Sequence, residues 1–208
     1  MNNPLYVLGA GGHGKVVVST LLACGFSVDG VLDDDAGKTG TTILGIPVIE
    51  TIEAFILRKG KARAVCAVGD NKTRKELTVR LASFPVEWVT AVHPAALVHP
   101  SVRLGDGTIV FAGAVIQPET VIGAHCIVNT GALIDHDCII GDFCHIAPGC
   151  RITGGVTVEE GAFLGAGATV IPGVVIGSWS VIGAGSTVIR DIRPGVTAAG
   201  SPARILKG

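Results

Sequence analysis

Three histidines in the second half of the sequence are of a type that can do acid–base chemistry near neutral pH. His136 stands between Asp135 and Asp137, while His125 lies eleven residues before it and His145 nine residues after it. A carboxylate beside an imidazole raises its pKa and can orient the ring, which suits a general base. Such a base takes the proton of an attacking amine or hydroxyl. The sequence therefore favours His136 as a candidate general base.

A glycine-rich stretch near the N-terminus has the spacing of a phosphate-binding turn. Gly9, Gly11 and Gly14 follow an apolar segment and precede a helical one, and Asp33 lies 24 residues beyond Gly9. This is the pattern of a dinucleotide fingerprint, but fewer than 100 residues leave room for one mononucleotide-binding half. We expect a single nucleotide, with phosphate on backbone N–H groups and with Asp33 and Asp34 accepting hydrogen bonds from a ribose or base. Alternatively, the glycines serve only close packing of the strand and the helix.

The elements around this turn alternate between short apolar strands and helical stretches. That alternation predicts a small α/β domain with a parallel sheet, which we expect to span residues 1–95. The expected strands are 5–8, 27–32, 64–68 and 86–89, and the expected helices are 16–24, 52–58 and 72–82.

The histidines, in contrast, lie in a six-residue repeat. An aliphatic residue recurs at every sixth position from Val98 to Val188, and a small or β-branched residue follows nearly every one by four positions. A period of six is that of a parallel β-helix, in which three units close a coil of about 18 residues and coils stack about 4.8 Å apart. We expect this all-β domain to span residues 96–208, with outward-facing histidines. Glycine often follows the aliphatic residue directly, where we expect a sharp turn with positive φ: Gly105, Gly123, Gly141, Gly165, Gly177 and Gly183.

Composition narrows the class of protein. The 208 residues are 48% hydrophobic and 16% charged, with a formal net charge of -1, so we expect neither a nucleic acid nor a membrane as partner. The sequence has no long apolar span and no basic segment typical of a signal peptide, which favours a cytoplasmic protein.

The six cysteines do not suggest a metal site, because no Cys-x-x-Cys pair occurs. Four of them, Cys126, Cys138, Cys144 and Cys150, occupy the small position of the repeat, where alanine or serine serves elsewhere. We therefore interpret them as buried core residues and expect no metal.

As a set, these motifs resemble a known family. GAGGHGK, the strand end VLDDD, AVGDNKTRK, the junction AVHPAALVHPSV, a hexapeptide β-helix and a closing Gly-x-Pro-Ala-Arg segment are similar to the bacterial nucleotide-sugar acetyltransferases. These are hexapeptide-repeat acyltransferases typified by the bacillosamine-pathway N-acetyltransferase and the sialic acid O-acetyltransferases. The resemblance implies a Rossmann-like N-terminal domain that holds a nucleotide-sugar and a left-handed parallel β-helix that uses acetyl-CoA. It also implies a homotrimer with sites between subunits, which three phenylalanines that we expect to be exposed, Phe111, Phe143 and Phe163, would support.

The resemblance also implies roles for single residues. His136 would be the general base with Asp137, where the family example has glutamate. Acetyl-CoA would contact His145, Gly154, Ala166 and Ala184. The nucleotide-sugar would contact Gly11, Gly12, His13, Asp33, Asp34 and Gly69, with help from Asn71 and Arg74. We expect His125 to be a surface residue.

The predicted function is acetyl-CoA-dependent N-acetylation of a nucleotide-linked amino sugar at C4, by direct attack of the amine on the thioester. O-acetylation of a sialic acid or related sugar is the alternative within the class. A γ-type carbonic anhydrase would use three histidines on a metal, but the spacing of His125, His136 and His145 does not match such a site. A non-catalytic nucleotide-sugar sensor or scaffold is a further alternative.

Overall fold

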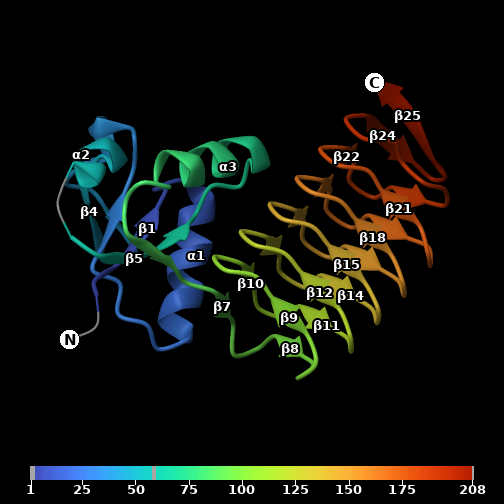
Figure 1. Cartoon of the computed structure of the whole chain (residues 1–208), viewed down its shortest axis with the longest axis horizontal. Helices are drawn as coiled ribbons and strands as arrows, with labels where there is room; N and C mark the ends of the chain where they lie inside the picture. The colour runs from blue at the N-terminus through green and yellow to red at the C-terminus, as the bar shows by residue number, and fades with distance from the viewer. Residues whose placement is uncertain (1–2, 58–59, 208) are drawn as a thin grey trace. The chain divides into compact units, whose positions relative to one another are not determined.

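The computed structural model describes residues 3–57 and 60–207. They fall into two compact units, residues 1–93 and 94–208 (Figure 1). Among the described residues, no helix has the length and apolar character needed to cross a membrane.

The first unit is an α/β domain, and the strand order of its sheet is β3-β4-β2-β1-β5-β6. All neighbours are parallel except β3 and β4, which form a hairpin. The prediction of a Rossmann-like parallel sheet is therefore confirmed. The strands are β1 (Leu5–Leu8), β2 (Gly30–Leu32), β3 (Thr42–Ile43), β4 (Ile46–Glu50), β5 (Ala62–Cys66) and β6 (Val86–Trp88), and β7 (Ala91–Val92) ends the unit.

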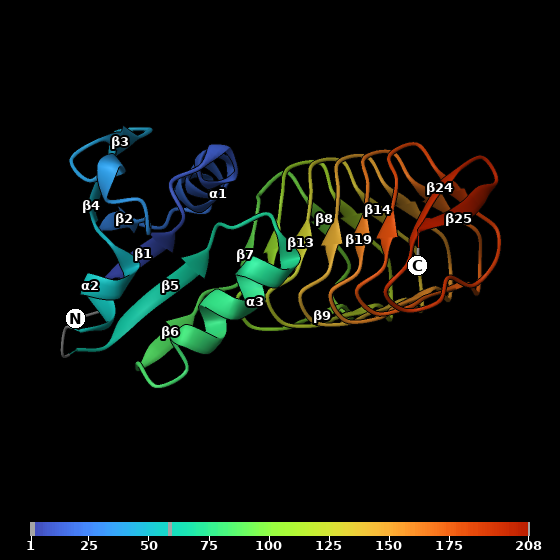
Figure 2. The same ribbon diagram turned by 90° about the horizontal axis from the view of Figure 1, so that it is seen from above.

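Helices cover both faces of this sheet (Figure 2). α2 (Ile52–Ile56) and α3 (Asn71–Arg80) pack on one face, where Phe55 and Leu77 join a buried cluster with Leu8 and Leu32. α1 (Gly12–Ala23) buries Val17, Val18 and Leu21 on the opposite side, and a 3-10 turn, η1 (Ala36–Lys38), follows β2.

All three helices differ from the sequence prediction in their bounds, and α3, expected at 72–82, spans Asn71–Arg80. α1 begins at Gly12, four residues before the expected start, because the glycine-rich stretch itself forms the first helical turn. α2 is described only to its C-cap, Leu57, so residue 58 of the expected helix lies outside the described residues.

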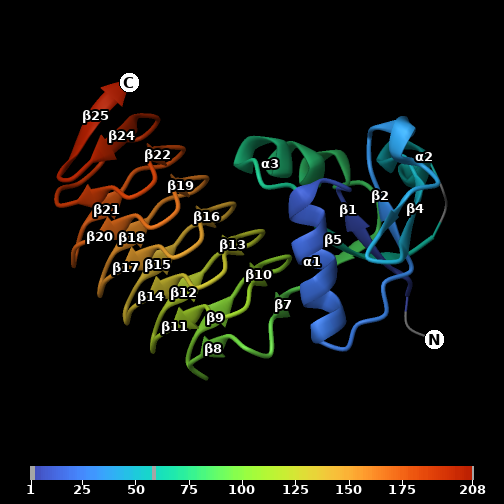
Figure 3. The ribbon, with the colours of Figure 1, turned by 180° about the vertical axis from the view of Figure 1, so that it is seen from behind.

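The second unit is the predicted β-helix, built from two-residue strands that pair in parallel with the strand one coil on. Its first face contains β10 (Ile109–Val110), β13 (Ile127–Val128), β16 (His145–Ile146), β19 (Phe163–Leu164) and β22 (Val181–Ile182). Its second face, seen in Figure 3, contains β8 (Leu97–Val98), β11 (Val115–Ile116), β14 (Leu133–Ile134), β17 (Arg151–Ile152), β20 (Thr169–Val170) and β23 (Thr187–Val188). Its third face contains β9 (Arg103–Leu104), β12 (Val121–Ile122), β15 (Ile139–Ile140), β18 (Thr157–Val158) and β21 (Val175–Ile176).

The six-residue aliphatic series forms the core of the coils, as predicted. Every member from Val110 to Val188 is buried, while Val98 and Leu104 in the first coil are half-buried. The pattern works because successive coils place the inner residue of each strand directly against its equivalent, as in the pair Ile116 and Ile134.

The small residues of the repeat do more than fill the corners. The hydroxyl of Thr108 donates to the carbonyl of Gly123 at 2.7 Å, and the thiol of Cys126 donates to the carbonyl of Gly141 at 3.0 Å. The same bond, always to the residue fifteen positions on, is made by Thr120, Cys138, Cys144 and Cys150. The four cysteines are buried thiols outside any disulfide, which confirms their structural interpretation, and the hydrogen bond of each links its coil to the next.

The expectation for the glycines that follow the aliphatic residue is wrong. Positive φ occurs two positions later, as at Gly107, Gly131 and Gly149, with φ between 65° and 70°. Gly105, Gly123, Gly141, Gly165 and Gly177 instead lie where a Cβ atom would come within 2.4–2.7 Å of the backbone nitrogen of the next coil. Glycine is required there by close stacking of the coils, not by the direction of the turn.

The predicted exposure of three phenylalanines is also wrong in part. Phe111 is fully buried, and Phe143 and Phe163 are half-buried. The exposed apolar side chains of the coils include Leu133, Ile139 and Val181, so they, not Phe111, are available to other surfaces.

The chain leaves the six-residue register after β23. β24 (Thr197–Gly200) pairs in parallel with β22, and β25 (Ala203–Lys207) pairs antiparallel with β24. This hairpin adds two strands to the last coil on the first face, where an open strand edge would otherwise remain.

Candidate functional site

His136 and Asp137 form a hydrogen-bonded pair in the turn between the second and third faces of the coils. Nδ1 of His136 donates to Oδ2 of Asp137 at 2.7 Å, and the backbone N–H of His136 donates to Oδ1 of Asp135 at 2.8 Å. The side chains of His136 and Asp137 are 59% and 65% exposed. Because Nδ1 carries the proton in this bond, Nε2 of the neutral ring keeps its lone pair and can accept a proton.

The carboxylates beside His136 make its imidazole a stronger base. The hydrogen bond to Asp137, followed by the negative charge of Asp135, raises the pKa of His136 above its ordinary value. A raised pKa, a ring nitrogen that can accept a proton and an orienting carboxylate are the properties of a general base.

The residues predicted to hold acetyl-CoA fall into two groups. His145 in β16 is buried, and Nδ2 of Asn129 donates to its Nε2 at 3.1 Å. Ala166 and Ala184 are exposed one above the other in the turn that follows this face, and the carbonyl of Ala166 accepts from Gly185. Gly154, however, lies against the imidazole of His136 in the turn between the second and third faces. The sequence analysis did not predict Asn129 as a site residue. Its position in the turn after β13 could have indicated it.

His125 is not the surface residue that we expected. Its ring is buried and stacks on Phe143, with centroids 5.2 Å apart and planes 13° from parallel. Phe143 lies one coil on, so the aromatic ring of that coil covers the imidazole. Within residues 3–57 and 60–207, no three or more His, Cys, Asp or Glu side chains are grouped to hold a metal ion.

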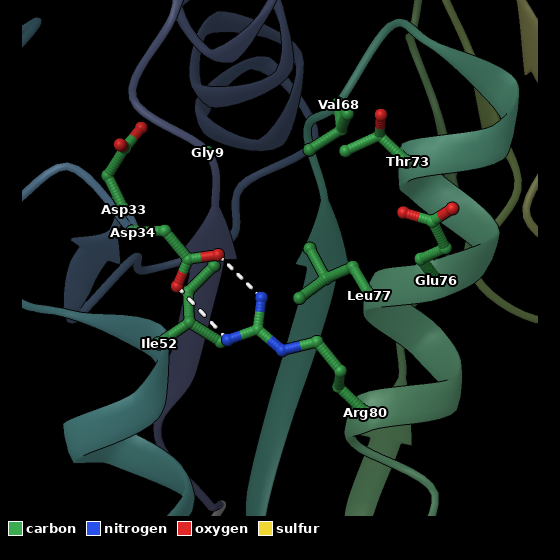
Figure 4. A pocket seen from close by; sticks show the side chains of 9 residues that line it. All are labelled: Gly9, Asp33, Asp34, Ile52, Val68, Thr73, Glu76, Leu77 and Arg80. Carbon is green, nitrogen blue, oxygen red and sulfur yellow. Dashed lines mark hydrogen bonds and ion pairs between the residues drawn. The ribbon is translucent and has the colours of Figure 1, made fainter.

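In the first unit, a pocket of about 180 Å³ opens at the carboxyl ends of β1, β2 and β5 (Figure 4). Ligands of open α/β sheets bind at this edge. The lining residues are Gly9, Asp33, Asp34, Ile52, Val68, Thr73, Glu76, Leu77 and Arg80.

The two predicted acidic residues of this pocket have different surroundings. Oδ2 of Asp33 accepts from the backbone N–H of Ala10 at 2.6 Å and from Nζ of Lys38 at 3.0 Å, while Oδ1 accepts from the N–H of Asp35. Partial burial opposes the charge, but these hydrogen bonds outweigh it and hold the pKa of Asp33 below its ordinary value. Asp33 thus anchors the glycine-rich turn.

Asp34 instead reaches across the pocket. Its carboxylate accepts two hydrogen bonds from the guanidinium of Arg80, at 2.6 and 3.2 Å, and both side chains are about half exposed (Figure 4). Sequence reasoning missed Thr73, Glu76, Leu77 and Arg80, although their spacing of three and four residues marks one face of a helix.

The glycines of the N-terminal turn divide into two kinds. A Cβ atom on Gly9 would lie 2.9 Å from the carbonyl oxygen of Ala67, and one on Gly14 would overlap the carbonyl oxygen of Gly9, so packing requires both. Gly11 and Gly12 are exposed with no neighbouring atom within 4 Å of a Cβ position. Gly11 is the N-cap of α1, and no side chain caps the helix there.

Next to this helix start, His13 is held neutral. Burial, with a smaller effect from the positive charge of Arg74, lowers the pKa of His13 to about 4. At neutral pH it is therefore a hydrogen-bonding group without charge.

The remaining predicted substrate residues form the turn after β5. Arg74 is 1% exposed, and its guanidinium donates to the carbonyls of Val68 and Gly69 and to Oδ1 of Asn71. Asn71 is buried as well, while Gly69 has open space at its Cβ position. Arg74 and Asn71 are built into the turn rather than the pocket lining, and direct substrate contact by them stays a prediction.

Known families match both units. The PglD N-terminal domain matches residues 4–81, and the bacterial transferase hexapeptide repeat matches residues 119–154 and 155–190. UDP-N-acetylbacillosamine N-acetyltransferase from Bacillus subtilis is 44% identical over 112 residues, which cover 51% of this chain and 50% of that enzyme. The matches span about half or less of the length of the curated relatives.

Solved structures match over the whole chain. PerB from Caulobacter crescentus, in complex with CoA and GDP-perosamine, is 43% identical with a TM-score of 0.92, covering 100% of this chain and 99% of PerB. The acetyltransferase domain of PglB from Neisseria gonorrhoeae, in complex with acetyl coenzyme A, is 37% identical with a TM-score of 0.90, covering 99% and 100%. The chain therefore belongs to the bacterial hexapeptide-repeat acetyltransferases that carry a PglD-type N-terminal domain.

Proposed function

We propose that the chain transfers an acetyl group from acetyl-CoA to the amino group, at C4, of a nucleotide-linked amino sugar. The observation that carries this proposal is the exposed His136–Asp137 pair in a chain that matches PerB, bound to CoA and GDP-perosamine, over its full length. Residues 1–95 would hold the nucleotide, and residues 96–208 would carry out the transfer.

In this reaction the neutral amine attacks the thioester carbonyl. A C–N bond forms as the C–S bond breaks, Nε2 of His136 takes the proton from the nitrogen, and the CoA sulfur leaves and is protonated to the thiol. Asp137 holds the ring through Nδ1 and stabilises the imidazolium that forms. No acyl-enzyme intermediate is needed, since the buried cysteines donate to carbonyls.

The open start of α1 suits the diphosphate of the substrate. Helix N-termini bind phosphate through their backbone N–H groups, and Gly11 and Gly12 leave the space beside the start of α1 free of side chains. Asp34 would accept hydrogen bonds from the ribose or base, and Gly69 would allow close approach to the turn after β5. Asp33 would act by holding the turn.

The positions of the predicted catalytic and cofactor residues support a homotrimer as part of this proposal. His136 is in the turn between the second and third faces, whereas His145, Ala166 and Ala184 are on the first face and the turn beyond it. A site that uses both groups would combine one edge of the coils with a different edge of a neighbouring chain, and three-fold closure repeats that junction three times.

The substrates also suggest a cytoplasmic protein, because acetyl-CoA and nucleotide-sugars are made there. Six free cysteines fit a reducing compartment.

The first experiment measures CoA release from acetyl-CoA with 4-amino sugars linked to UDP, GDP and dTDP, and with a sialic acid as hydroxyl acceptor. We expect turnover of one amino sugar and at least a hundredfold loss of kcat in His136→Ala. Release with the sialic acid alone would favour O-acetylation. Nucleotide-sugar binding without turnover in the native chain would instead indicate a sensor or scaffold.

Complementation tests the position of the site. His136→Ala and His145→Ala chains, each inactive as a homotrimer, are unfolded together and reassembled. With sites between subunits, about a quarter of all junctions in an equal mixture regain both native histidines, so activity returns. If the site lies within one chain, the mixture stays inactive.

A further inference from the structure

Gly154 lies one coil beyond His136, at the same position in the turn between the second and third faces. A Cβ atom built on Gly154 would lie 2.7 Å from Cε1 of His136, 2.8 Å from Nε2 and 3.3 Å from Nδ1. Carbon atoms in contact are ordinarily 3.5–4.0 Å apart, so the imidazole occupies the volume that any side chain at residue 154 would need.

We propose that Gly154 is a positioning residue for His136, because the absence of a side chain at residue 154 creates the space in which the imidazole lies. This inference rests on the proposed role of His136 as the general base. It gives Gly154 a function other than the backbone contact with acetyl-CoA that the resemblance implies.

The backbone offers no other reason for glycine at this position. The φ of Gly154 is outside the left-handed region, and the three atoms nearest its Cβ position all belong to the His136 ring. At Gly123 and Gly141, in contrast, a Cβ atom would meet backbone atoms of the next coil. The adjacent Gly155 has a φ of 68° and open space, so the conformation of the turn itself favours glycine there.

The contact sets the direction of the ring. Nδ1 is held by Asp137 at 2.7 Å on one side, and the Cε1–Nε2 edge lies where a Cβ atom of residue 154 would be on the other. Because the ring is more than half exposed, a methyl group at residue 154 would push it outward without a need to unfold the coil. The ring would then lose the geometry of its bond to Asp137, and Nε2 would point elsewhere.

The test compares Gly154→Ala with Gly155→Ala, a neighbouring change of the same size that meets no atom of His136. Both variants are checked by circular dichroism and thermal unfolding. For Gly154→Ala we expect kcat to fall 10- to 100-fold with the KM for acetyl-CoA within threefold of the native value. For Gly155→Ala we expect lower thermal stability, because of its positive φ, but nearly native kcat per folded molecule.

A readout without substrate separates this inference from the proposed function. The NMR titration of the Cε1 proton of His136, assigned by comparison with His136→Asn, reports the bond to Asp137. We expect its midpoint to move to lower pH in Gly154→Ala and to stay in place in Gly155→Ala.

Two results would overturn the inference. One is a Gly154→Ala variant with native kcat and a native titration of His136. The other is a raised KM for acetyl-CoA with both of those unchanged, which would assign Gly154 to the cofactor. Full activity in His136→Ala would contradict the proposed function itself, whereas the titration would still show whether Gly154 positions the ring.

Discussion

Asp137 places its Oδ2 2.7 Å from Nδ1 of His136 while its own backbone has a φ of +58°. The next two coils have Gly155 and Gly173 at this corner, with φ of 68° and 73°, which is the residue that such a conformation favours. Asp137 therefore keeps a carboxylate at a position where glycine would be less strained, and the proposed role of His136 as general base would account for it.

Replacing Asp137 by glycine removes the carboxylate but keeps the turn, so the variant tests the carboxylate alone. We expect Asp137→Gly to fold at least as stably as the native chain, but to lose 10-fold or more in kcat because the imidazole is no longer oriented. The pKa of His136, which the hydrogen bond to Asp137 and the charge of Asp135 raise, falls in this variant. The base is then unprotonated at lower pH, so the acidic limb of the kcat/KM profile moves down the pH scale.

Glu119 supplies the matched control, since it has a φ of 60° at the same corner one coil earlier. Glu119→Gly should keep the native pH profile and kcat. Equal losses in both variants would show that the turn, not the carboxylate of Asp137, is what activity needs.

The Arg80–Asp34 pair predicts an effect on nucleotide binding. Since Asp34 faces the pocket and Arg80 occupies its oxygens, a ligand that bonds to Asp34 must compete with the guanidinium. An exposed ion pair contributes about 0–1 kcal/mol, so Arg80→Met should tighten nucleotide-sugar binding by up to about fivefold, and Asp34→Asn should weaken it. Calorimetric titration at low and high salt measures both, and the effect of Arg80→Met should shrink as salt rises. Weaker binding in Arg80→Met would mean that Arg80 itself holds the ligand.

His13 makes the stability of the first unit depend on pH. Its pKa of about 4 in the folded chain lies below the ordinary 6.5, so the unfolded chain binds a proton that the folded chain does not. The stability that depends on a neutral His13 is fully present above pH 6.5 and is lost progressively as pH falls from 6.5 towards 4. Urea unfolding at several pH values should show a shallower decline in His13→Gln across this window. An unchanged decline would place the proton uptake on another group.

The four cysteines at the small position of the repeat should be unreactive towards thiol reagents in the folded protein. Burial raises the pKa of the Cys150 thiol to about 11, and its hydrogen donates to the carbonyl of Gly165 at 3.1 Å. We expect Cys126, Cys138, Cys144 and Cys150 to react with a thiol reagent only after unfolding. Because a hydroxyl can make the same bond, as Thr108 does, Cys150→Ser should keep activity and cost less stability than Cys150→Ala, for which we expect about 1 kcal/mol. Rapid native labelling of Cys150, or loss of activity in the serine variant, would contradict this interpretation.

The sequence by itself determined the architecture and the candidate base. The six-residue period has the length of one strand and one corner, so a single aliphatic series is enough to specify stacked coils with Val110 to Val188 inside. The neighbours Asp135, His136 and Asp137 are consecutive, and their bonds depend only on local geometry. The glycine-rich turn after β1 is likewise a local pattern, since the groups that we propose to bind phosphate belong to the backbone.

Only the tertiary structure decided which residues meet across coils and across the pocket. The contacts of Gly154 with His136 and of His125 with Phe143 join residues in neighbouring coils, and Asp34 meets Arg80 over 46 positions of sequence. The period shows which residues share a corner, but not whether a side chain leans over the next coil or away from it. For the same reason the sequence placed positive φ at Gly105 rather than at Gly107. The distance between stacked backbones, which excludes any Cβ atom at Gly105, exists only once the coils are packed.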